Sequence, residues 1–197
     1  NFVYDFLYPN PASVLAFIEN HDTDRFLGEG QNLAMLKQAT TLLLTTRRIP
    51  QLYYGTEIMM NGVKTKSDGY VRCDFPGGWA GDKQNAFTAE GRTELQNECY
   101  NFYKTILNWR KGNDVIAKGS MTQFMVQNGV YAYARQYEGK TVFVMLNGTD
   151  SETTLPLKFY KEILKDTKQG KDILTGRTIS FTEDLKMAAR ESLVIEL

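Results

Sequence analysis

The chain has 197 residues, of which 42% are hydrophobic and 23% are charged, a composition typical of a folded globular protein. Its 23 basic and 23 acidic residues cancel, and no long run of like charge occurs, so the sequence favours neither nucleic acid nor an anionic membrane surface as a partner. The longest strongly apolar stretch, around Leu42, is far shorter than the roughly 20 residues of a membrane-spanning helix. We therefore expect a neutral molecule as the partner, with no nucleic acid and no membrane.

The first residue and the two cysteines are the features of the sequence that bear on the cellular compartment. The sequence begins with Asn1 and shows neither an initiator Met nor a signal peptide, which we interpret as a processed or excised piece. Cys73 and Cys99 are too few for a disulfide framework and lack metal-ligand spacing. No cofactor or metal is indicated. The compartment stays open, with a periplasmic or extracellular location favoured over the cytoplasm.

Two short apolar runs flank a helical pattern near the start of the chain. Residues 13–19 are apolar on both faces, as a buried parallel strand is, and residues 51–54 form a second such run before Gly55. Between them, apolar side chains at helical spacing predict an amphipathic helix over residues 32–47. This order predicts a β-loop-α-β unit.

The rest of the chain divides into a loop, a helix and an all-β region. Residues 61–87 lack periodicity and predict a long functional loop. A capping-box pattern at residues 93–96 then begins a helix that we expect to end near Arg110. The remaining residues alternate in short runs separated by turns. The sequence therefore predicts an α/β plus all-β protein, with an α/β part over residues 1–111 and a small antiparallel β-sandwich over residues 112–197.

Side chains that could carry chemistry gather directly after the first predicted strand. Residues 19–25 read Glu-Asn-His-Asp-Thr-Asp-Arg, and they include the single histidine of the chain, His21. In α/β barrels, active sites lie at this carboxyl end of the strands. The alternatives are a solvated turn, or an Asp22 that caps the next stretch. A metal site is the weaker reading, because adjacent residues on an extended strand point in opposite directions.

Three ordered segments resemble motifs of the α-amylase family, glycoside hydrolase family 13. They are residues 17–22, Phe-Ile-Glu-Asn-His-Asp; residues 49–57, Ile-Pro-Gln-Leu-Tyr-Tyr-Gly-Thr-Glu; and residues 68–79, which contain an Asp-x-x-x-Arg pattern and then Asp-Phe-Pro-Gly-Gly-Trp. The Asp-Phe-Pro-Gly-Gly wording is most similar to neopullulanase and cyclomaltodextrinase-type members. The resemblance implies that residues 1–111 are the C-terminal part of a (β/α)8 barrel, with strands seven and eight, and that the β-sandwich follows it.

The resemblance also implies roles for particular residues. Asp22 matches the third carboxylate of the family, which contacts sugar hydroxyls and distorts the ring toward the transition state. His21 matches a hydrogen-bond donor to the same ring. Asp68 and Arg72 match residues that hold the neighbouring sugar. The implied partners are maltooligosaccharides or a starch-like α-glucan.

Other matched positions are supporting, and two catalytic groups are missing. Asn20 and Glu57 match supporting positions, and Arg25 is a weaker match. A retaining glycosidase needs a nucleophile and a general acid about 5 Å apart, which the family places after barrel strands four and five. The family's Gly-x-Arg-x-Asp segment, which carries the nucleophile, does not occur here. We therefore expect a C-terminal fragment, inactive alone, of an active α-glucan-degrading parent. Calcium in that parent stays an open question.

Alternative interpretations exist for two tryptophans and for the function of the chain as a whole. Trp79 either stacks on a sugar or plugs its loop, whereas Trp109 reads as core. Cys73 has no histidine near it in sequence, so a catalytic thiol is not expected. One alternative function is a non-catalytic barrel homologue that acts in interaction or sugar binding, and another is a free-standing binding module over residues 118–197. A truncated barrel would also leave strand edges open, so we expect self-association or partial disorder before residue 90.

Overall fold

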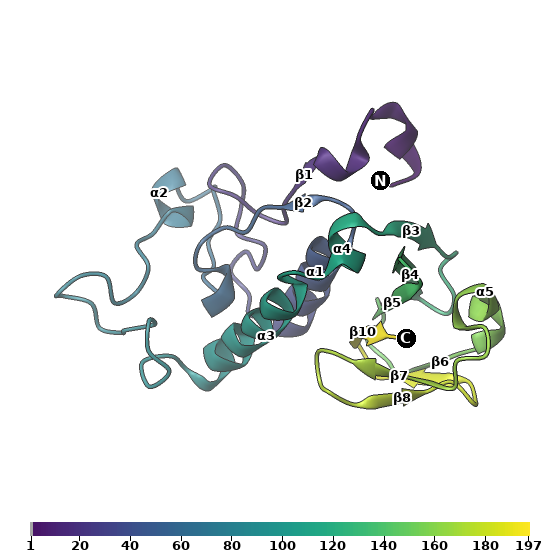
Figure 1. Ribbon diagram of the computed structural model, residues 1–197. Helices are drawn as coiled ribbons and strands as arrows, with labels where there is room; N and C mark the ends of the chain where they lie inside the picture. The colour runs from purple at the N-terminus through teal and green to yellow at the C-terminus, as the bar shows by residue number, and fades with distance from the viewer. Residues whose placement is uncertain (1) are drawn as a thin grey trace.

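The computed structural model describes residues 2–197; residue 1, with which the predicted barrel part begins, lies outside the described residues. Helices and loops make up the first part of the chain and a β-sheet domain the second (Figure 1). The α-helices are α1 (Leu33–Thr45), α2 (Asp68–Val71), α3 (Glu94–Arg110), α4 (Asp114–Lys118) and α5 (Lys161–Leu164). The strands are β1 (Leu15–Ala16), β2 (Ile49–Pro50), β3 (Ser120–Gln123), β4 (Val130–Tyr137), β5 (Lys140–Asn147), β6 (Thr153–Leu155), β7 (Gln169–Asp172), β8 (Thr178–Ser180), β9 (Leu185–Met187) and β10 (Ser192–Glu196). Short 3₁₀ helices span Phe2–Leu7, Pro11–Ser13, Thr56–Ile58 and Leu157–Tyr160.

The first two strands form a short parallel pair joined through α1. Leu15 pairs with Ile49, and the prediction of a β-loop-α-β unit is therefore confirmed. The strand predicted over residues 13–19 is only two residues long, and the run 51–54 lies just past β2. The side chains of Leu15 and Phe17 are 53% and 43% exposed, so the prediction of a strand buried on both faces is wrong. The reason is that this sheet has two strands among the described residues, too few to cover both faces.

The helices begin where their capping residues predict. The side chain of Asn32 accepts a hydrogen bond from the third amide of α1. At the start of α3, the Thr93 hydroxyl accepts from the Gln96 amide at 3.2 Å and the Gln96 side chain accepts from the Thr93 amide at 2.9 Å, which is the predicted capping box. In the described part of the chain, none of the helices is both long and apolar enough to cross a membrane.

A small core holds α1 against α3. Leu36, Cys99 and Tyr103 are buried in it, and the Tyr103 hydroxyl lies 2.7 Å from that of Thr40. Burial raises the pKa of the Cys99 thiol to about 12, so Cys99 is a neutral apolar side chain here. This contact makes the two longest helices one unit.

The second part of the chain is the antiparallel β domain that the alternating runs predict. Six strands form one sheet in the order β3-β4-β5-β10-β7-β8, and β6 pairs separately with β9. One face of the large sheet packs against β6, β9 and α5 through a core that includes Phe143, Leu155 and Met187. The opposite face packs against α4 and contacts α1 and α3. Tyr131, Tyr133 and Tyr137 share that face, as their alternation predicts.

Arg135 joins the helices to this sheet. The residue is 1% exposed, and its guanidinium donates to four backbone carbonyls: Thr45 at 2.8 Å, Ile116 at 2.9 Å, Gly119 at 2.8 Å and Ser120 at 3.2 Å. The first of these is at the end of α1, and the next two flank the end of α4. Burial lowers the pKa of Arg135 to about 10, so the group keeps its positive charge at neutral pH. A cation at helix C-termini satisfies carbonyls that have no partner within the helix.

Asp5 anchors the beginning of the described chain. It is 5% exposed and lies between Arg47, whose Nε donates at 2.5 Å, and Arg48, which forms a close ion pair with it. The hydrogen bond from Arg48 holds the pKa of Asp5 below its usual value, although burial acts in the opposite direction. The first 3₁₀ helix is thus fixed to the segment after α1.

We expect replacement of Arg135 by Ala to lower the free energy of unfolding by about 3 kcal/mol or more, because three buried carbonyls and one part-buried carbonyl lose their donor. The shift of the urea midpoint measures this loss. Arg177→Ala is the matched control, because Arg177 forms an exposed ion pair with Glu191, and it should change the midpoint little. Equal midpoints for the two variants would contradict the role of Arg135.

We expect Asp5→Asn to destabilise the protein near neutral pH and to lose this effect in acid. The folded pKa of Asp5 is lowered, so its contribution is complete above the unfolded value of about 3.9 and disappears as the pH falls through the folded value. Thermal midpoints of wild type and Asp5→Asn at pH about 7 and about 2 measure the change. Asp166→Asn, at an exposed position, should show a small difference at both values.

Candidate functional site

The segment after β1 folds into a tight turn through local hydrogen bonds. The side chain of Asn20 accepts from the backbone amide of Asp22 at 2.7 Å, and the amide of Asn20 donates to the Thr23 hydroxyl at 3.0 Å. This turn directs His21 and Asp22 outward, where their side chains are 59% and 63% exposed. Asn20 therefore supports the turn that carries Asp22.

Four of the residues singled out in the sequence lie together above this turn. Nη2 of Arg72 lies 3.0 Å from a carboxylate oxygen of Asp22 and 3.3 Å from one of Asp68. Nε of Arg72 donates to the backbone carbonyl of His21 at 2.9 Å, and the imidazole of His21 lies 3.1 Å from the Asp22 carboxylate. We call Asp22, His21, Asp68 and Arg72 the Asp22 cluster.

Lys64 also lies beside the Asp22 cluster, although the sequence analysis does not single it out. Nζ of Lys64 donates to the backbone carbonyl of Asp22 at 3.0 Å and lies 3.3 Å from the Asp68 carboxylate. No sequence signal identified Lys64, because it lies in a turn of the loop without periodicity and outside α2. Glu57, in contrast, lies in the 3₁₀ helix Thr56–Ile58 and makes no hydrogen bond or ion pair with the cluster among the described residues. With Lys64 and Arg72 opposite two carboxylates, the formal charges cancel when His21 is neutral, which suits an uncharged ligand.

A buried carboxylate supports the turn from below. Glu19 is 2% exposed, and its carboxylate accepts hydrogen bonds from the Thr56 hydroxyl and the backbone amide of Phe26. Nη1 of Arg25, itself 1% exposed, lies 3.3 Å from the same carboxylate. A buried carboxylate of this kind is satisfied by several donors at once. The two ends of the turn are thereby held to the loop after β2.

Arg25 extends this support to the helix that carries Asp68. Its guanidinium donates to the carbonyls of Tyr54 at 2.6 Å and Val71 at 3.1 Å, and it lies 4.0 Å from the ring centroid of Tyr53. Arg25 thus connects the three segments that surround the cluster. Arg25 is a weak match to the family pattern in the sequence, but in the structure it joins Glu19, Tyr54 and Val71 beneath the site.

The segment after Arg72 is also tied down. The hydroxyl of Tyr54 donates to the carbonyl of Cys73 at 2.6 Å, and burial raises the pKa of Tyr54, so this donor stays protonated. The exposed thiol of Cys73 contacts the carbonyls of Gly69 and Tyr70 in the preceding turn. No general base contacts this thiol among the described residues.

Trp79 lies in the long loop that follows the cluster. A carboxylate oxygen of Asp82 accepts from the amides of Gly77 at 2.6 Å and Trp79 at 3.1 Å, which closes a tight turn. Gly77 has φ of 103°, a conformation that favours glycine. Trp79 is 68% exposed, because this turn directs the ring into solvent; stacking on a sugar and packing against the barrel both stay predictions for it.

Chemically, the cluster offers carboxylate acceptors and cationic donors close together on an open surface. Groups of this kind hydrogen-bond to several hydroxyls of one ligand. Over residues 2–197, no group of three or more His, Cys, Asp or Glu side chains is arranged to hold a metal ion.

The chain is similar to known carbohydrate-active proteins. The family model of the cyclo-malto-dextrinase C-terminal domain matches residues 121–196. An α-amylase from Niallia circulans is 32% identical over 170 residues, which are 82% of this chain and 29% of that protein. A cyclomaltodextrin glucanotransferase from Bacillus sp. strain 6.6.3 is 31% identical over 179 residues, which are 85% of this chain and 22% of that protein. The chain therefore spans less than a third of the length of these curated relatives.

A solved structure shares the fold. The α-amylase from Geobacillus thermoleovorans, complexed with acarbose, matches with a TM-score of 0.71 and 23% identity over 96% of this chain and 40% of that chain. These comparisons confirm the resemblance predicted from the three motifs. The family-model match also agrees with the antiparallel sheet and with the cyclomaltodextrinase-type wording of residues 74–78.

We expect Glu19→Gln to lower the free energy of unfolding by about 3 kcal/mol, because Arg25 is left buried without its counter-charge. Amide hydrogen exchange should also quicken in residues 20–27 and 71–73, which Glu19 and Arg25 hold in place. Glu29→Gln is the matched control, because Glu29 forms an exposed pair with Lys66. Unchanged exchange around Asp22 in Glu19→Gln would show that this buried pair does not position the site.

Proposed function

The chain is a member of the α-amylase family, and on that premise we propose that it is the C-terminal portion of a retaining glycoside hydrolase that degrades α-glucans. The observation that carries this proposal is the convergence of Asp22, His21, Asp68 and Arg72, which come from two loops about fifty residues apart in sequence. A structural scaffold has no need of an exposed cluster of this kind supported by a buried ion pair.

We further propose that β1 and β2 are strands seven and eight of a (β/α)8 barrel. In this proposal residues 1–111 belong to the barrel and residues 112–197 form the domain that follows it, with the boundary at the end of α3. Two observations support it: β1 and β2 are parallel with α1 between them, and Leu15 and Phe17 have exposed apolar side chains. The remaining strands of the parent would cover these side chains and the open edges of the pair.

In this proposal Asp22 is the residue closest to the chemistry. Its carboxylate accepts hydrogen bonds from hydroxyls of the reacting sugar, and such bonds lower the barrier when they strengthen in the oxocarbenium-like transition state. The contact at 3.0 Å with Arg72 fixes the orientation of that carboxylate. His21 donates to the same sugar, and Asp68 with Arg72 holds the neighbouring unit.

The nucleophile and the general acid belong to the rest of the parent in this proposal. The 197-residue chain alone therefore binds maltooligosaccharides without hydrolysing them, and the parent hydrolyses a starch-like α-glucan. Open exposure of Asp22 and Arg72 supports this division, because a catalytic cleft needs walls on both sides to exclude water.

We expect Asp22→Asn in the parent to lower kcat on amylose by roughly 100-fold or more, because several kcal/mol of transition-state stabilisation are lost. The control is Asp150→Asn, the same chemical change at a side chain that is 85% exposed in the β domain. Initial rates on amylose, pullulan and cyclodextrin measure the effect and identify the preferred substrate. An Asp22→Asn parent with wild-type kcat would refute the role of Asp22, and a parent inactive on all three would refute the proposed function.

A further inference from the structure

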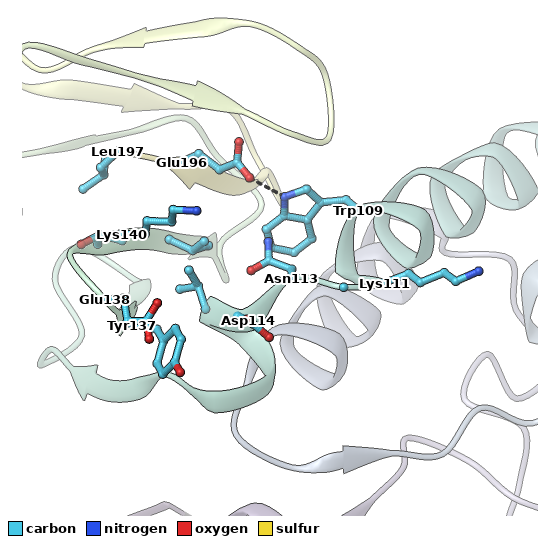
Figure 2. Close-up of a pocket in the computed structure, with 13 residues that line it drawn as sticks. Trp109, Lys111, Asn113, Asp114, Tyr137, Glu138, Lys140, Glu196 and Leu197 are labelled. Carbon is cyan, nitrogen blue, oxygen red and sulfur yellow. Dashed lines mark hydrogen bonds between the residues drawn. The ribbon is translucent and has the colours of Figure 1, made fainter.

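A cavity lies outside the Asp22 cluster and shares no lining residue with it. Its volume is about 620 Å³, and it opens where the end of α3 meets α4, the turn between β4 and β5, and β10 (Figure 2). This volume is within the range of small-molecule sites, roughly 300–1,000 Å³. The loops around the Asp22 cluster precede the beginning of α3, whereas this cavity lies at its end. That helix has 17 residues and is therefore roughly 25 Å long.

Trp109 forms one wall of the cavity in a fixed orientation. It projects from the end of α3, and its indole N–H donates to the carboxylate of Glu196 on β10 at 2.7 Å (Figure 2). The ring is half-buried and packs against the core beneath the cavity, to which Val115 and Val142 belong. The sequence predicts Trp109 as a core residue. In the structure, the residue packs against the core and also lines the cavity.

The opposite wall is a rigid turn that carries a second aromatic ring. Tyr137 pairs with Lys140 across a two-residue hairpin turn. The two turn residues, Glu138 and Gly139, have φ of 47° and 77°, as a type I′ turn requires. Tyr137, Glu138 and Lys140 all line the cavity (Figure 2). Both walls are therefore in place before a ligand arrives.

The charges at the cavity do not suit an anionic ligand. Glu138, Glu196 and Lys140 line the cavity, whereas the side chain of Lys111 points away (Figure 2). The ammonium group of Lys118 lies 5.6 Å from the ring centroid of Tyr137. Asp114 is already paired with Lys118, whose Nζ lies 3.0 Å away. Carboxylates and an ammonium beside aromatic rings offer acceptors and a donor for hydroxyl groups, together with apolar faces.

We propose that this cavity is a second oligosaccharide-binding site, which takes a short α-glucan segment between Trp109 and Tyr137. The C–H face of a sugar ring packs on the indole, the carboxylate of Glu196 accepts from a sugar hydroxyl, and Lys140 donates to another. The choice of α-glucan rests on the proposed function, whereas the aromatic and polar lining does not. A polymer held here has a raised local concentration at the Asp22 cluster, because the two sites belong to one chain.

The test is titration of the 197-residue chain with maltoheptaose, followed by calorimetry and by NMR of the indole N–H signal of Trp109. Two variants remove a carboxylate and a half-buried ring from the cavity, Glu196→Ala and Tyr137→Ala, and a third, Trp109→Ala, removes the platform. We expect each to weaken binding at the cavity by about tenfold. Thermal midpoints show whether each variant is folded. Phe159→Ala is the matched control, because Phe159 is an exposed aromatic residue on another surface of the β domain.

A double variant, Asp22→Ala with Arg72→Ala, separates this site from the Asp22 cluster. Maltoheptaose binding that survives in the double variant, and falls in Glu196→Ala and Tyr137→Ala, supports the second site. Binding that is lost in the double variant alone overturns it, and so does a Trp109 signal that does not move in wild type. Cellohexaose, a β-linked glucan, identifies the linkage. If it shifts the Trp109 signal and maltoheptaose does not, the α-glucan assignment fails while the cavity remains a sugar site. The activity of the parent is not a readout here, so the proposed function stands or falls separately.

Discussion

The arrangement of the whole chain depends on one buried cation at the seam between helices and sheet. Among residues 2–197, no carboxylate forms an ion pair with Arg135, and its charge is balanced by carbonyl dipoles from the ends of two helices and from β3. A second bond at the same place joins the hydroxyls of Thr45 and Tyr133. Because the donors are in β4 and the acceptors in α1 and α4, neither part satisfies its polar groups without the other. This seam argues against a free-standing binding module over residues 118–197.

The candidate site repeats the same physical design on a smaller scale. An exposed set of charged side chains has little orientation of its own, since surface ion pairs contribute little and long side chains are mobile. Beneath the set, Glu19 and Arg25 are buried and bonded to backbone groups of three segments. The exposed residues thereby gain a defined geometry from a layer that does not itself meet the ligand. The cavity at Trp109 is built in a comparable way, with a rigid turn on one side and a hydrogen-bonded indole on the other.

Much of the fold follows from local signals in the sequence. The capping box of α3, the apolar spacing of α1 and the alternation in β4 and β5 each specify an element through contacts within a few residues, and these elements are present as predicted. The resemblance to the α-amylase family also implied that Asp22 and Arg72 act on neighbouring sugar units, and the two side chains lie 3.0 Å apart. The exposure of β1 was not foreseeable, since it depends on how many strands lie beside it.

The contacts that the sequence did not reveal are those between distant segments. Lys64 reaches Asp22 because of the path of a loop without periodicity, and no spacing rule describes such a path. The bond between Trp109 and Glu196 joins residues 87 apart. Helical spacing predicts that Trp109 lies on the apolar face of α3, but it does not predict the hydrogen-bond partner of the indole N–H. Local patterns therefore predicted the helices and the antiparallel strands, whereas the contacts of Lys64 and Trp109 with residues far away in sequence were not predicted.

The distance in sequence between Thr45 and Arg135 also has a consequence for synthesis. The two residues are 90 positions apart, so the carbonyls at the end of α1 leave the ribosome well before their donor is made. At typical elongation rates this interval is about 5–20 s. During that time the end of α1 is hydrated, and the helix has neither its cationic cap nor the sheet beneath it. During synthesis α1 thus waits for β4 before it acquires its final environment, and any pause in translation over this stretch prolongs a state with exposed apolar surface.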